Sequence, residues 1–199
     1  MNLVIVSGIP CSGKTTIGKM LARHFDYKFL SKDMYKEELF LRHGFTSIEE
    51  KKKLDFMAEE MLYHEIENNI ACDENMIVDK WLQGMSMLTK IKDISNANIV
   101  FIRLITSPII ATQRYNYRNE HGYRPMCFMV ENRFPIIDNE NAIFEKRMSV
   151  GEMTEKANRP FFKDGIDNLL EIDTTNIEKD SNIIYPRIIA FVEKIITVL

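Results

Sequence analysis

The most informative chemical motif in the sequence is formed by residues Gly8, Ile9, Pro10, Cys11, Ser12, Gly13, Lys14, Thr15 and Thr16. They match G-x-x-x-x-G-K-[ST], a phosphate-binding loop in which glycines let backbone N–H groups turn toward phosphate oxygens. An apolar run at 3–6 predicts a buried strand before the loop, and a helical pattern follows at 17–23. Lys14 is expected to reach the β- and γ-phosphates, and the Thr15 hydroxyl to bind Mg²⁺. The motif in this setting predicts binding of a nucleoside triphosphate.

Asp33 is a candidate general base. It directly follows a predicted strand at 28–30, where a carboxylate can accept or orient the proton of an incoming hydroxyl. The alternative is structural, since Ser31 or Asp33 could cap the helix that is predicted to run through residue 43. We favour the catalytic interpretation, because the position faces the expected cleft.

Asp79 is a candidate metal ligand, because it closes a short apolar strand at 76–78. An acidic residue at the end of such a strand is typical of a Walker B motif, in which the Asp carboxylate helps to coordinate Mg²⁺. Lys80 stands where a second acidic residue is often found. We favour a metal or substrate contact for Asp79 over a plain turn residue.

Arg114 and Arg118 follow the predicted strand at 99–105 and are four residues apart, so they share one helix face. Two guanidinium groups on one face suit recognition of phosphate oxygens, although a solvated arginine face fits the spacing equally well. Asp173 closes the last predicted strand, and the loop after it should lie beside the phosphate loop, near the nucleotide base. Asp173 is therefore a candidate nucleotide contact, with a simple turn as the alternative.

Five strand-length apolar runs alternate with helical patterns, at residues 3–6, 28–30, 76–78, 99–105 and 169–172. This alternation predicts a parallel sheet covered on both faces, with ligands at the carboxyl ends of the strands. The longest helix is predicted at 46–70, opened by a capping box from Ser47 and Glu50 or from Thr46 and Glu49.

Residues 119–165 show a weaker apolar pattern that three prolines interrupt. We interpret them as an irregular insertion with one helix at about 139–158. Phosphoryl transfer needs water excluded from its site, so this region is a candidate lid, with an ordinary surface excursion as the alternative.

The composition fits one globular domain over residues 1–199, with 45% hydrophobic and 28% charged residues. The net charge of −3 gives no electrostatic footprint for duplex nucleic acid, and no apolar run is long enough to span a membrane. Three cysteines without metal-type spacing predict a reduced, cytoplasmic protein.

Taken together, these residues resemble the P-loop kinases related to nucleoside monophosphate kinases, closest to polynucleotide kinase, chloramphenicol phosphotransferase, zeta toxin and gluconate kinase. The resemblance rests on the phosphate loop, Asp33, Asp79, the Arg114 and Arg118 pair, and Asp173 with the two threonines after it. It implies a P-loop NTPase fold of three α/β/α layers around a five-stranded parallel sheet, with a helical lid insertion. It also implies ATP and Mg²⁺ as cofactors, Asp33 as the hydroxyl-activating carboxylate, and Arg114 and Arg118 as lid arginines. The Lys80-Trp81 pair departs from the small polar residues of several members.

Three functions are compatible with these features. The leading hypothesis is an ATP-dependent kinase acting on a hydroxyl of a small molecule. The second is a kinase for a nucleotide or a polynucleotide 5′ end, against which the lack of a basic excess counts mildly in the case of a nucleic-acid acceptor. The third is an ATP-binding regulatory or toxin-like module that transfers phosphate to no acceptor.

Overall fold

The computed structural model describes residues 1–81, 97–121, 128, 147–161 and 166–197. Its centre is a parallel sheet in the order β2-β3-β1-β4-β5. The strands are β1 (Asn2–Gly8), β2 (Lys28–Ser31), β3 (Met76–Asp79), β4 (Asn98–Ile105) and β5 (Leu169–Asp173). All five contain the strands predicted from the sequence, so the five-stranded parallel sheet of a P-loop NTPase fold is confirmed.

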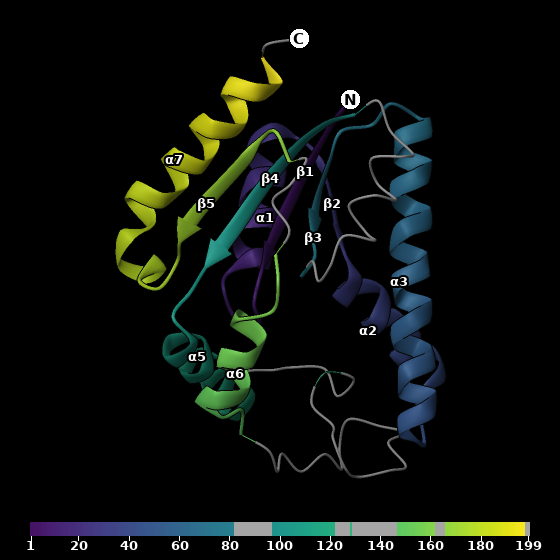
Figure 1. Cartoon of the computed structure of the whole chain (residues 1–199). Coiled ribbons are helices and arrows are strands. Elements are labelled where there is room, and N and C mark those ends of the chain that lie inside the picture. The colour runs from purple at the N-terminus through teal and green to yellow at the C-terminus, as the bar shows by residue number, and fades with distance from the viewer. Residues whose placement is uncertain (82–96, 122–127, 129–146, 162–165, 198–199) are drawn as a thin grey trace.

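Side chains that alternate along β1 give the sheet two apolar faces. Val4 and Val6 pack with residues of α1 (Lys14–Phe25) and α7 (Ile177–Ile196), whereas Leu3 and Ile5 pack with α3 (Ile48–Ala71). Figure 1 shows α7 beside β5 and α3 on the opposite side of the sheet. Because β1 is central and buried on both faces, the loop that follows it starts from a fixed position.

A separate small core joins α2 (Lys32–His43) to α3. It contains Leu39, Phe40, Phe45, Leu54 and Ala58. At the start of α3, the Ser47 hydroxyl accepts a hydrogen bond from the Glu50 amide, while the Glu50 carboxylate accepts from Thr46. Ser47 is therefore the N-cap, but the predicted capping box with Glu50 forms only in part, because the Glu50 carboxylate binds Thr46 instead of the Ser47 amide. This core holds the facing sides of α2 and α3 in register.

Two helices lie beyond the carboxyl ends of β4 and β5, namely α5 (Pro108–His121) and α6 (Val150–Ala157) (Figure 1). The prediction of a helix from about residue 139 was wrong over 147–149, because Ser149 caps α6 through a capping box with Glu152. Residues 139–146 lie outside the described part of the chain. Much of the lid predicted at 119–165 also lies outside the described residues, so the movement of this lid stays a prediction. None of the described helices is both long and apolar enough to cross a bilayer.

Candidate active site

The phosphate loop connects β1 to α1 in a conformation that two glycines make possible. Gly13 has a φ of 94°, in the left-handed region that favours glycine. A Cβ on Gly8 would lie 2.6 Å from Ser12 Oγ and 2.8 Å from the Leu104 carbonyl oxygen. The loop therefore packs closely on β4 and turns directly into the N-terminus of α1. Backbone N–H groups at such a terminus form an anion-binding site.

The nine motif residues divide into two groups. Six of them line a large cavity: Pro10, Cys11, Gly13, Lys14, Thr15 and Thr16. Gly8, Ile9 and Ser12 lie buried beneath the loop instead. They lie outside the cavity lining, and their contact with the nucleotide stays a prediction.

Lys14 and Thr15 link the loop to the end of β3. The Lys14 ammonium donates to the Ile9 carbonyl at 2.9 Å, and the Thr15 hydroxyl donates to Asp79 Oδ2 at 2.5 Å. Burial lowers the pKa of Lys14, although Asp79 and Asp33 oppose that shift. Burial raises the pKa of Asp79, against the effects of Lys14 and Thr15. Charged groups of both signs are thus concentrated where a triphosphate would end.

The pair of Thr15 and Asp79 fits a Mg²⁺ site. Magnesium in nucleotide-binding proteins takes one or two protein oxygens and completes its shell with phosphates and water. Within the described residues, no group of three or more His, Cys, Asp or Glu could hold a metal. A hydroxyl and a carboxylate that already touch are what such a sparse site requires.

Asp33 lies in the first turn of α2 and lines the same cavity. Ser31 occupies the N-cap position of this helix, and its side chain makes no capping hydrogen bond. The capping role considered for Asp33 is therefore wrong. Its charge acts on both Lys14 and Asp79, and all three side chains line the one cavity.

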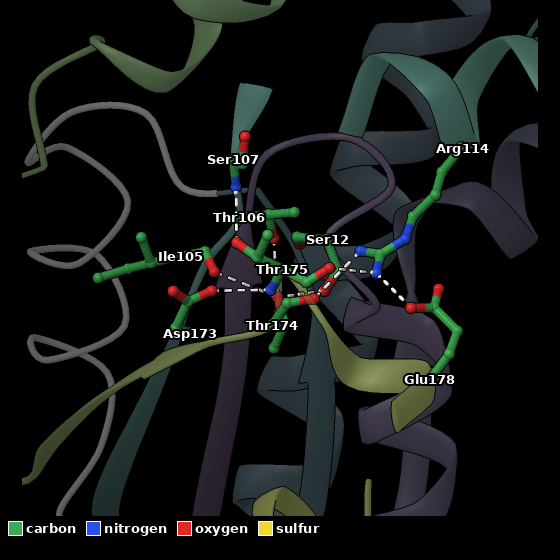
Figure 2. Close-up of polar contacts among 9 residues, drawn as sticks. All are labelled: Ser12, Ile105, Thr106, Ser107, Arg114, Asp173, Thr174, Thr175 and Glu178. Atoms are coloured by element: carbon green, nitrogen blue, oxygen red, sulfur yellow. Dashed lines mark hydrogen bonds and ion pairs between the residues drawn. The ribbon is translucent and has the colours of Figure 1, made fainter. Parts of the chain in front are cut away.

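Arg114 and Arg118 both line the cavity, but their environments differ. Arg114 donates to the carbonyls of Thr174 and Thr175, at 3.1 and 2.9 Å, and forms an ion pair with Glu178 at 2.7 Å. Figure 2 shows this guanidinium reaching the loop between β5 and α7. Arg118 has no hydrogen-bond or ion-pair partner within the part of the chain that the structure describes, and its charge acts on Lys14.

The loop between β5 and α7 lies against the phosphate loop, as the sequence led us to expect. The Thr174 hydroxyl donates a hydrogen bond to the Ser12 carbonyl at 2.9 Å and lies 2.7 Å from the Thr106 hydroxyl (Figure 2). Asp173 accepts a hydrogen bond from the Thr175 amide at 2.7 Å and is exposed, outside the cavity lining. Its observed role is local to the turn, and a nucleotide contact stays a prediction.

The opposite wall of the cavity carries charged residues that sequence reasoning missed. Lys36 pairs with Asp55 at 2.7 Å, and Lys32 pairs with Glu59 at 3.0 Å, so that α2 and α3 form two rungs of an antiparallel ladder. Lys80, from the end of β3, also pairs with Glu59. We call these five residues the ion-pair ladder. The i, i+4 spacing on both helices was a visible signal, but only the fold shows that the two rows face each other.

Two aromatic side chains accompany the ion-pair ladder. The Lys36 ammonium lies 5.1 Å from the centre of the Phe128 ring, and the Lys80 ammonium lies 4.7 Å from the centre of the Tyr63 ring. Burial, reinforced by Glu59, raises the pKa of Tyr63 to about 12. The phenol is therefore a neutral group at the edge of the cavity.

The cavity that joins these parts has a volume of about 920 Å³. A pocket of this size accommodates a nucleotide and a second small molecule together. One half is formed by the phosphate loop, α5 and α7, and we call it the nucleotide half. The other is formed by α2, α3 and the end of β3, and we call it the acceptor half. Asp33 is on α2 and so lines the acceptor half, while its charge acts on Lys14 of the nucleotide half.

Comparison with known proteins agrees with this architecture. A cytidylate kinase from Sulfurisphaera tokodaii is 29% identical over an alignment of 102 residues, and the match covers 49% of this chain. The chain matches only 56% of that kinase. A solved structure described as a "putative kinase" from Chloroflexus aurantiacus has a TM-score of 0.72 and 23% identity, over 98% of this chain and 97% of that one.

A gluconokinase from Sinorhizobium meliloti has a TM-score of 0.62 at 14% identity, with 99% of this chain and 95% of that chain covered. At these identities the solved structures show a shared fold. The family model that matches residues 4–134, more than half of the chain, is described as an AAA domain. The P-loop kinase resemblance is thus confirmed at the level of family and fold, and the chain belongs to this AAA domain family.

Proposed function

We propose that this protein is an ATP-dependent kinase that transfers the γ-phosphate of ATP to a hydroxyl of a small molecule. The observation that carries the proposal is one cavity that holds Lys14, Thr15, Asp33, Asp79 and Arg118 together. A triphosphate-binding loop alone also serves motors and switches. A carboxylate where the nucleotide half meets a second, separately lined half is what a kinase needs to transfer a phosphate from one ligand to another.

The chemistry assigned to these residues is in-line phosphoryl transfer. The acceptor hydroxyl oxygen forms a bond to the γ-phosphorus while the bond from that phosphorus to the β,γ-bridging oxygen breaks, which releases ADP. Asp33 orients the hydroxyl and takes its proton. Lys14 and Arg118 stabilise the negative charge that spreads over the transferring group. Mg²⁺, held by Thr15 and Asp79, would neutralise charge on the phosphates.

Arg114 has a different assignment in this proposal. Its guanidinium is engaged by two carbonyls and Glu178, so it fixes the loop between β5 and α7 against α5. We assign Arg114 as a positioning residue for the nucleotide and Arg118 as the catalytic arginine. This division revises the equal roles expected from their spacing.

A screen for transfer from γ-labelled ATP to a metabolite library tests the proposal, with the Lys14→Ala variant as control. We expect a labelled, phosphorylated metabolite from the wild type and none from the variant. ATP hydrolysis that no metabolite accelerates would contradict it and favour a regulatory module.

One observation supports a second candidate. The relative from Sulfurisphaera tokodaii is a cytidylate kinase, and the matched region is 29% identical. A nucleoside monophosphate as acceptor would make this chain a nucleotide kinase. Labelled nucleoside diphosphate in the same screen is the outcome that distinguishes it.

A further inference from the structure

The acceptor half of the cavity is lined by charges that largely neutralise one another. Its described lining contains three ammonium groups, Lys32, Lys36 and Lys80, and four carboxylates. The carboxylates are Asp33, Asp55, Glu59 and Asp79. Each lysine already has a carboxylate partner in the ion-pair ladder. The described wall therefore offers a ligand no excess of positive charge.

Burial makes these pairs costly to separate. The side chains of Lys36 and Lys80 are only 10% and 8% exposed, while Asp55 and Glu59 are about one third exposed, at 31% and 32%. Removing a partner from a buried charge is strongly unfavourable. A ligand that displaced either carboxylate from its lysine would bear that penalty, so a favourable ligand binds the intact pairs.

Hydroxyl groups can bind such pairs without disrupting them. One hydroxyl accepts a hydrogen bond from an ammonium and donates its own to a carboxylate, which accepts at two oxygens. The two rungs are about 6 Å apart along α2, because Lys32 and Lys36 are four residues apart in this helix. Hydroxyls two or three carbons apart on a short chain or ring, rather than adjacent ones, span a separation of that order.

An anionic acceptor suits this wall less well. A carboxylate or phosphate placed there would lie beside Asp33, Asp55 and Glu59, and like charges repel strongly in a partly dry cavity. Arginine suits bidentate binding of phosphate. Among the described lining residues, the arginines are Arg114 and Arg118, both on α5 in the nucleotide half.

We propose that the acceptor is an uncharged polyhydroxylated molecule, a sugar or a polyol, whose hydroxyls are bound by the ion-pair ladder. This inference rests on the proposed kinase function and narrows its substrate class. Phe128 and Tyr63 line the same half and offer aromatic surface to the C–H groups of such a ligand.

Paired acceptors that differ in one charged group test this class directly. The wild type is assayed with γ-labelled ATP and aldoses or polyols, each against its own aldonate, such as glucitol against gluconate. Cytidine monophosphate and homoserine form further arms. We expect labelled product from a neutral member, with kcat/KM at least about tenfold above that of its aldonate.

Each other outcome is decisive. Preferred transfer to an aldonate, to cytidine monophosphate or to homoserine overturns the acceptor class and leaves the kinase function intact. No product in any arm, with ATP still bound in calorimetry, overturns the kinase function and the acceptor class together.

A change of selectivity in one variant links the result to the ion-pair ladder. Glu59→Gln removes the carboxylate that Lys32 and Lys80 share, so the wall gains a positive charge. We expect the preference for the neutral member to shrink about tenfold or to reverse, with KM for ATP unchanged. Glu60→Gln is the matched control, because Glu60 neighbours Glu59 on α3 and lies outside the lining.

An unchanged preference in Glu59→Gln would overturn the role of the ion-pair ladder. If that variant does not fold, Asp55→Asn supplies the same test at the other rung, through Lys36.

Discussion

The two halves of the cavity are held in place by different interactions. In the nucleotide half, side chains bind backbone carbonyls of loops: Lys14 binds Ile9, Thr174 binds Ser12, and Arg114 binds the loop after β5. In the acceptor half, long charged side chains on two helices bind one another. The first arrangement fixes the backbone that grips a phosphate. The second leaves a wall whose properties depend on side chains, and so permits a different acceptor with few substitutions.

The largest effect should come from the nucleotide half, at Lys14. We expect Lys14→Met to reduce the transfer rate by about 10³-fold, because the ammonium stabilises charge on the transferring group. Burial lowers the pKa of Lys14, which means that the fold disfavours its charge. The apolar variant should therefore unfold at no lower denaturant concentration than the wild type. Retained transfer would show that the phosphate is held elsewhere.

Substitution of Arg118 and of Arg114 should affect catalysis and stability differently. Arg118→Ala is expected to reduce kcat by about 10²-fold with little change in stability. Arg114→Ala should raise KM for ATP and lower the free energy of unfolding by about 1–3 kcal/mol, since the carbonyls of Thr174 and Thr175 lose their donor. Steady-state kinetics and denaturant unfolding measure both. Identical profiles would contradict their division of roles.

Asp79 should show opposite effects on activity and stability. Its pKa is raised in the fold, chiefly by burial, so its stabilising contribution is present at low pH and lost as the pH rises through the folded pKa. Asp79→Asn keeps a side-chain acceptor for Thr15 and removes the charge. We expect Mg²⁺-dependent transfer to fall, while the variant is more stable than the wild type at about pH 7. Lower stability there would contradict this account.

The smallest effect is expected in the acceptor half, at Lys36. Burial acts to raise the pKa of Asp55, but the charge and hydrogen bond of Lys36 outweigh it and hold that pKa below its ordinary value. This pair therefore stabilises the fold above the ordinary carboxyl pKa, and the contribution is lost as the pH falls through the folded pKa. The free energy of unfolding of Lys36→Met should therefore differ less from that of the wild type at acidic pH than at neutral pH.

The same variant compares the two halves kinetically. Lys36→Met should raise KM for the acceptor and leave KM for ATP unchanged, because Lys36 lines only the acceptor half. A change in KM for ATP would show that the halves are coupled.

The nucleotide half could be predicted from the sequence because its chemistry depends on local backbone geometry. Gly8 and Gly13 are needed where they stand, and Lys14 and Thr15 follow at fixed offsets. Asp33 and Asp79 follow strand ends and both line the cavity, since parallel strands bring their carboxyl ends to one edge.

The acceptor half could not be predicted in this way. Lys36 and Asp55 are on different helices, and their contact depends on how α2 packs on α3. Arg114 and Arg118 were also indistinguishable by spacing, and only the position of the loop after β5 separated them.

The central claim is that Asp33 joins the two halves by activating an acceptor hydroxyl. Single-turnover transfer of labelled phosphate to the acceptor, compared between the wild type and Asp33→Asn, tests it most directly. We predict an unchanged Kd for ATP and a transfer rate reduced by about 10²–10⁴-fold. Transfer at the wild-type rate in Asp33→Asn would contradict the account.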